Sequence, residues 1–76
     1  MEELEDIHIG DIIKRKLVNT ERSEAWLARK IDCDRGNLHR QLCKKQIAIS
    51  LLQKISVAMK FDFFSCYSEH IRKQIV

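Results

Sequence analysis

Apolar side chains recur at intervals of three and four residues along most of the chain, which is the period of an amphipathic helix. Four such stripes follow one another and each predicts one helix: Ile9, Ile12, Ile13 and Leu17; Trp26, Leu27 and Ile31; Leu38 and Leu42; Leu51, Leu52, Ile55, Ala58 and Met59. The first helix is predicted over about residues 7–18, and a fifth begins at Phe63-Phe64. The pattern therefore predicts an all-α protein with five helices.

Polar residues mark where four of these helices begin. Ser23, Asp34, Ser50 and Asp62 are of the types whose side chains accept a hydrogen bond from the backbone of a first helical turn. Before the third helix, Asp32 can adopt the left-handed backbone that a tight turn demands. A helix of about eight residues, a turn of about three and a second short helix form a helix-turn-helix. We expect that motif at the centre of the domain.

Composition indicates a single small domain inside the cell. A chain of 76 residues buries too little surface for two cores, and it has no proline and two glycines, which leaves few turns for a sheet. We expect the domain over residues 7–67, an acidic segment at 1–6 and a helical extension or tail at 68–76. Three cysteines without paired spacing indicate reduced thiols, and no segment approaches the roughly 20 apolar residues of a membrane span. A cytoplasmic protein with no membrane contact is predicted.

The charge of the chain is distributed unevenly. The formal net charge is +3, but the first 13 residues hold five acids and no base. Residues 14–76 therefore hold 14 bases against 6 acids, a net +8, which favours a polyanionic partner. Within residues 35–45 there are four bases and no acid. Two hypotheses stay open on charge alone: binding of double-stranded DNA, and a small helical interaction module that binds an acidic protein.

Four sequence blocks stand in a characteristic order: Ile9-Gly10-x-x-Ile13; Trp26-Leu27-Ala28-x-Lys30-Ile31; Asp34-Arg35-x-Asn37-Leu38-x-Arg40; and Leu51-Leu52-x-Lys54-Ile55-Ser56-x-Ala58-Met59, followed by Asp62-Phe63-Phe64. In this order they resemble the Cro/lambda-repressor type of helix-turn-helix protein, the XRE family, and the ending is similar to a compact subgroup common in Bacteroidetes genomes. The resemblance implies a compact five-helix lambda-repressor-like domain that binds specific double-stranded DNA, usually as a homodimer. We expect a transcriptional regulator, in the first place a repressor.

The third helix, from about Asp34 to Leu42, supplies the candidates for reading the DNA sequence. A recognition helix enters the major groove N-terminus first, so the outward residues of its opening turns meet base edges. Counted from the Asp34 cap, the outward residues are Arg35, Gly36, His39 and Arg40. An arginine can donate two hydrogen bonds to guanine O6 and N7, and a glycine permits close approach. The resemblance implies the same base-reading role for Arg35, Gly36 and Arg40.

Other residues are candidates for binding the phosphate backbone. The resemblance implies this role for Asn37, and basic charge adds Lys44, Lys45 and Arg15. Ser23, at the start of the second helix, completes the set. The chain departs from the family pattern where Glu24 and Asp32 stand near positions at which the family commonly has glutamine and glycine, and where Cys43-Lys44 replaces an Asn-Gly. Glu24 cannot donate to a phosphate as a glutamine would.

Three further interpretations carry less weight. Cys33, His39 and Cys43 suggest a zinc site, but their spacing lacks the paired turn of a zinc knuckle, so we expect no metal. Cys33 should fill an apolar position of the turn, and Cys43 and Cys66 should pack as small hydrophobic groups. No nucleophile or carboxylate stands at motif spacing from a base, so we expect no enzyme activity, no cofactor and no small-molecule substrate.

The C-terminal extension offers one surface for self-association. Ile71, Ile75 and Val76 lie on one side of a predicted helix over residues 68–76, where they could form the seam of a homodimer. A frayed tail is the alternative at a chain end. A single helix-turn-helix touches few bases, and pairing two of them on matched half-sites raises specificity. A homodimer is therefore a further expectation.

Overall fold

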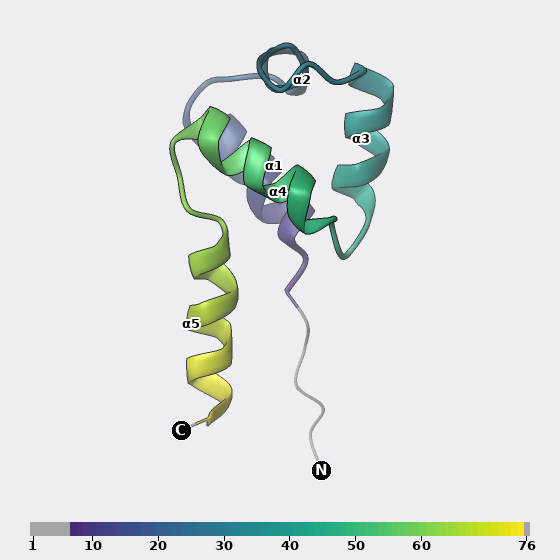
Figure 1. Ribbon diagram of the computed structural model, residues 1–76. Coiled ribbons are helices and arrows are strands. Elements are labelled where there is room, and N and C mark those ends of the chain that lie inside the picture. Colours follow the sequence, from purple (N-terminus) through teal and green to yellow (C-terminus); the bar gives the residue numbers. More distant parts are fainter. Residues whose placement is uncertain (1–6, 76) are drawn as a thin grey trace.

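The computed structural model describes residues 7–75, and over these residues the chain is all-helical, with five helices (Figure 1). They are α1 (Ile9–Asn19), α2 (Glu24–Lys30), α3 (Arg35–Cys43), α4 (Ile49–Met59) and α5 (Phe64–Ile75). The predicted acidic segment 1–6 and Val76 lie outside the described residues. The prediction of an all-α, five-helix protein is confirmed.

One hydrophobic core holds α1 to α4 together. Helix α1 packs against α3, and α2 packs against both α3 and α4. The side chains that are fully buried in this core are Phe63, Ile9, Ile13, Leu27, Leu38, Leu42, Leu52 and Ile55. Each predicted stripe contributes to it, because a helix buries its apolar face where another helix covers it.

The segment before α5 closes the core. Phe63 is fully buried just before the helix begins, and its ring meets that of Phe61 edge-on with centroids 4.7 Å apart. Within α5, Phe64, Cys66 and Tyr67 are half-buried against the core, and no residue of the helix is fully buried. The rest of α5 extends away from the other helices (Figure 1). The predicted extension at 68–76 is thus, through Ile75, the outer part of this helix.

Three of the four predicted helix starts carry the expected side-chain hydrogen bond. The Ser23 hydroxyl accepts from the Trp26 N–H at 3.0 Å, and the Asp34 carboxylate accepts from the Asn37 N–H at 3.0 Å. The Asp62 carboxylate likewise accepts from the N–H of Phe64, where α5 begins. These bonds satisfy backbone donors that a helix leaves unpaired at its start.

The prediction of a cap at Ser50 is wrong. Helix α4 begins at Ile49, its N-cap is Ala48, and no side chain accepts a hydrogen bond there. Ile47, one residue earlier, is buried in the core. Burial of this side chain fixes where the chain turns into α4, so the helix begins before the serine.

Three helices end in the same backbone arrangement. Glu21 after α1, Asp32 after α2 and Lys60 after α4 have φ angles of 58°, 55° and 53°, in the left-handed region. In each case the N–H of the next residue donates a hydrogen bond to a carbonyl oxygen in the last turn of the preceding helix. For Asp32 this bond runs from the Cys33 N–H to the Ala28 carbonyl at 2.8 Å. This pattern is the Schellman motif, in which the left-handed residue is usually glycine. The left-handed backbone predicted for Asp32 is confirmed.

Candidate nucleic-acid interface

Helices α2 and α3, joined by residues 31–34, place one side of α3 in the core and the other side in solvent. Leu38 and Leu42 are fully buried, as predicted. The four candidates for base reading, Arg35, Gly36, His39 and Arg40, are all exposed. The structure therefore brings these four residues together on one accessible helix face.

The start of α3 is exposed. A methyl group built on Gly36 would stand 3.8 Å from Nη1 of Arg40, so the Arg40 guanidinium reaches back over Gly36 toward the N-terminus of the helix. An open groove of about 580 Å³ lies beside it, lined by Glu24, Arg35, Gly36 and His39. Both arginines thus border the first turns of α3, the part of such a helix that meets base edges in a groove.

His39 is held by a residue of the neighbouring helix. Its Nδ1 lies 2.9 Å from Oε1 of Glu24, with the histidine side chain 58% exposed and the glutamate 26% exposed. Because the carboxylate can only accept, we assign the ring proton to Nδ1, which leaves Nε2 as an acceptor in the neutral ring. The pair joins the first turn of α2 to the middle of α3. The Glu24 carboxylate, a negative charge beside α3, therefore has a partner here.

Cys43, at the end of α3, is exposed, so the prediction that it packs as a small hydrophobic group is wrong. Leu42 takes the buried position at this turn and leaves Cys43 on the outer surface. Its Sγ lies 3.7 Å from Nε2 of His39 and 3.7 Å from Nζ of Lys14, which comes from α1. Side chains from three helices therefore form one polar chain of contacts along the outer face: Glu24, His39, Cys43 and Lys14.

The other two cysteines are half-buried and pack against the core, as expected. Cys33 contacts Asn37, whose side-chain amide donates to the sulfur at 3.8 Å. Burial raises the pKa of the Cys66 thiol, and the charges of Glu69 and Asp62 raise it further. Between residues 7 and 75, no three His, Cys, Asp or Glu side chains lie close enough together to hold a metal ion.

The candidates for phosphate contact are all exposed. Lys44 and Lys45 follow the helix directly, Asn37 lies in its first turns, Ser23 caps α2, and Arg15 lies on α1. The Ser23 oxygen accepts from the Trp26 N–H, and its own hydroxyl proton stays available to a further acceptor. Lys14, the residue before Arg15 on α1, reaches the end of α3, where its Nζ lies 3.7 Å from Sγ of Cys43.

No known protein family, no curated protein and no solved structure matches the chain at a level that would establish kinship. None of the helices found between residues 7 and 75 has the length and apolarity needed to cross a bilayer.

Proposed function

We propose that this protein is a sequence-specific, double-stranded DNA-binding transcriptional regulator that inserts α3 into the major groove. The observation that carries the proposal is the two-sided character of this nine-residue helix. Leu38 and Leu42 anchor one side in the core, while the opposite side presents two arginines, a histidine and a glycine with no acid among them. The major groove of B-DNA is about 12 Å wide and admits a helix presented in this way. The XRE-like blocks of the sequence support the same conclusion.

In this proposal Arg35 and Arg40 select the bases. Each guanidinium is exposed and can donate two hydrogen bonds to guanine O6 and N7, a contact worth about 1–3 kcal/mol of discrimination. Gly36 lets the helix backbone approach the groove floor, and the Glu24 contact fixes the orientation of the His39 ring before DNA arrives. A ring oriented in advance loses less freedom when it binds.

The remaining contacts position the protein on the backbone and do not select bases. Lys44, Lys45 and Arg15 neutralise phosphates, while Ser23 and Asn37 donate neutral hydrogen bonds. With three cations neutralising phosphates in each monomer, the logarithm of the binding constant should fall with the logarithm of salt concentration, with a slope near −0.9 per phosphate neutralised, or about −2.7 per monomer.

We extend the proposal to a homodimer that acts as a repressor. Two copies of α3 spaced about 34 Å apart would meet successive major grooves on one side of the duplex. The outer part of α5 offers the surface for pairing, because Ile71 and Ile75 are 52% and 76% exposed on a helix that extends from the core. A protein bound in this way denies its site to other DNA-binding proteins, which favours repression.

Selection from a random duplex library with the purified protein tests the proposal directly. The expected result is one enriched motif, roughly palindromic, whose binding weakens steeply with added salt. The alternative is a small interaction module that binds an acidic protein. It would be supported if no motif were recovered and if acidic polypeptides bound as tightly as any duplex.

A further inference from the structure

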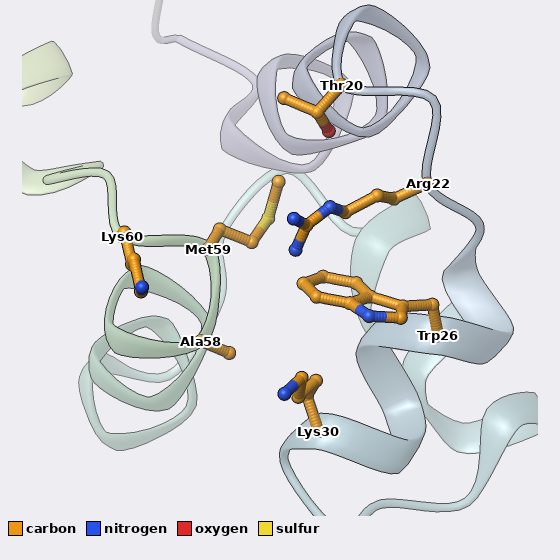
Figure 2. A pocket seen from close by; sticks show the side chains of 7 residues that line it. All are labelled: Thr20, Arg22, Trp26, Lys30, Ala58, Met59 and Lys60. Carbon is orange, nitrogen blue, oxygen red and sulfur yellow. The ribbon is translucent and has the colours of Figure 1, made fainter.

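A second surface feature lies away from α3, where three helices end. The turn after α1, the helix α2 and the end of α4 enclose a hollow of about 240 Å³, which we call the basic hollow (Figure 2). Its lining residues are Thr20, Arg22, Trp26, Lys30, Ala58, Met59 and Lys60. Among the described residues, none from α3 lines it, so its chemistry is separate from that of the proposed DNA-binding face.

The basic hollow gathers three cations without a carboxylate partner. Arg22, Lys30 and Lys60 come from three separate segments, and over residues 7–75 no carboxylate oxygen lies within 4.0 Å of their charged nitrogens. The carbonyl ends of α1, α2 and α4 offset part of this charge, about half an elementary charge each at most. A net positive charge remains in the hollow, and an anion would neutralise it.

Trp26 holds two of the cations in place. The Arg22 guanidinium lies 4.2 Å from the centroid of the indole ring, and the Lys30 ammonium lies 5.9 Å from it. Figure 2 shows the guanidinium between the ring and Met59, with Lys30 on the other side of the ring. A stacked guanidinium keeps its in-plane N–H donors free, and this edge can bind a phosphate or carboxylate through two hydrogen bonds.

We propose that the basic hollow binds a small organic phosphate. Its volume corresponds to roughly eight water molecules at about 30 Å³ each, which suits a phosphate group with a short carbon skeleton. After the offset by the three helix ends a net charge of at least about +1.5 remains (three cations less three half-charges), and a phosphate, with nearly two negative charges at neutral pH, matches it better than a single carboxylate does. The Ala58 and Met59 side chains form an apolar wall on which the carbon skeleton can lie.

The single tryptophan of the chain makes the site directly observable. We would titrate the protein with glycerol 3-phosphate at constant ionic strength and follow the fluorescence of Trp26, with inorganic phosphate, succinate and glycerol in parallel. The expected result is a saturable change with the organic phosphate, weaker binding of inorganic phosphate and succinate, and none of glycerol. Arg22→Gln should weaken binding about tenfold. Arg29→Gln, which removes an exposed charge of α2 outside the hollow, should leave binding unchanged.

A Lys60→Gly variant separates binding from folding. Lys60 has a left-handed backbone, with φ 53°, that glycine adopts without strain, so this variant should melt at an equal or higher temperature. The Lys60→Gly variant should nevertheless bind glycerol 3-phosphate several-fold more weakly, because a cation of the hollow is lost.

The proposal is overturned if no saturable change appears up to about 10 mM ligand, because even a weak site would be largely occupied at that concentration. It is equally overturned if Arg29→Gln weakens binding as much as Arg22→Gln, or if duplex DNA of arbitrary sequence displaces the ligand. All of these measurements can be made whether or not α3 reads DNA.

Discussion

The backbone of Gly10, in the first turn of α1, lies directly against the main-chain carbonyl of Leu42 in α3. A Cβ built on Gly10 would stand 1.8 Å from that oxygen, a separation that no side chain can adopt. Gly10 is buried, so the contact lies within the packed interior, where α1 meets α3. We expect Gly10→Ala to push the two helices apart and to cost about 1–3 kcal/mol or more of unfolding free energy, measured by urea denaturation.

Gly36→Ala is the matched control for that substitution. A Cβ at Gly36 would stand 3.8 Å from Nη1 of Arg40 and 3.2 Å from the Asp34 carboxylate oxygen that caps α3, and this exposed side chain need shift by only a few tenths of an ångström while keeping its cap. Alanine also stabilises a helix relative to glycine by roughly 0.5–1 kcal/mol. Stability should therefore stay level or rise, while affinity for the selected DNA site falls. Equal destabilisation by the two substitutions would contradict the close packing of α1 on α3.

Arg35→Ala and Arg40→Ala test the proposed base contacts. Both side chains are exposed, so each variant should keep its unfolding free energy within about 0.5 kcal/mol of the unchanged protein. Each should lose about 1–3 kcal/mol of preference for the selected site over a scrambled duplex, measured by competition binding. Parallel losses on both duplexes would assign the arginines to the phosphate backbone instead.

Glu24→Gln tests the charge beside α3. The substitution removes a negative charge from the edge of the proposed DNA-binding face and supplies a donor for phosphate. We expect tighter binding to a scrambled duplex and, because His39 is held less firmly, a smaller preference for the selected site. The same substitution weakens the contact with His39 and the favourable charge at the start of α2, at a cost of about 0.3–1 kcal/mol in stability. Unchanged affinity would place Glu24 away from the bound duplex.

Cys43 can serve as a chemical probe of the same face. Its thiol is exposed at the end of α3, whereas Cys33 and Cys66 are half-buried, so it should react first with a thiol-specific reagent. Bound DNA of the selected sequence should slow this reaction strongly and leave the slower phases of Cys33 and Cys66 unaltered. Mass spectrometry of the labelled protein would identify the residue. Undiminished labelling of Cys43 in the complex would count against insertion of α3.

Cys66 should make the protein less stable in alkaline solution. Burial, then the charges of Glu69 and Asp62, raise the pKa of its thiol above the usual value of 9.0, so the folded chain holds this proton more tightly than the unfolded chain. The resulting stability is present below pH 9.0 and is lost as the pH rises through the raised value. Burial, and then the neighbouring Cys66, raise the pKa of Tyr67 in the same direction.

Melting temperatures measured from about pH 8 to about pH 10.5 check this sign. The decline above pH 9.0 should be shallower in Cys66→Ser than in the unchanged protein, because serine does not titrate in this range. Cys43→Ser, at the exposed position, should follow the unchanged protein. Parallel curves for all three proteins would show that the Cys66 thiol does not contribute.

Much of the fold follows from local features of the sequence. The period of the apolar stripes and the capping preferences of Ser23, Asp34 and Asp62 are properties of a few neighbouring residues, and they located the starts of the five helices within one or two residues. The prediction of a cap at Ser50 failed because the buried Ile47 sets the start of α4, and the burial of Ile47 depends on how distant helices pack. The exposure of Arg35 and Arg40 could be predicted because Leu38 and Leu42 identify the buried side of the same helix.

Contacts between helices could not be predicted in this way. Glu24 and His39 are 15 residues apart, and only the angle between α2 and α3 brings them to 2.9 Å. Lys14 and Cys43 are 29 residues apart and meet because α1 crosses the end of α3. The glycine in Ile9-Gly10 was the one signal of that crossing, since a glycine inside a helix usually serves a close approach. The basic hollow likewise combines the ends of helices that are distant in sequence.

The three left-handed helix ends have a consequence for engineering. Glu21 and Asp32 occupy backbone conformations that cost a side-chain-bearing residue about 1 kcal/mol or more, and glycine would relieve that cost at either position. A domain of this size has only a few kcal/mol of stability in reserve. Replacing both residues would therefore yield a more stable scaffold, tolerant of randomised sequences on the outward side of α3, in which the proposed DNA preference could be varied.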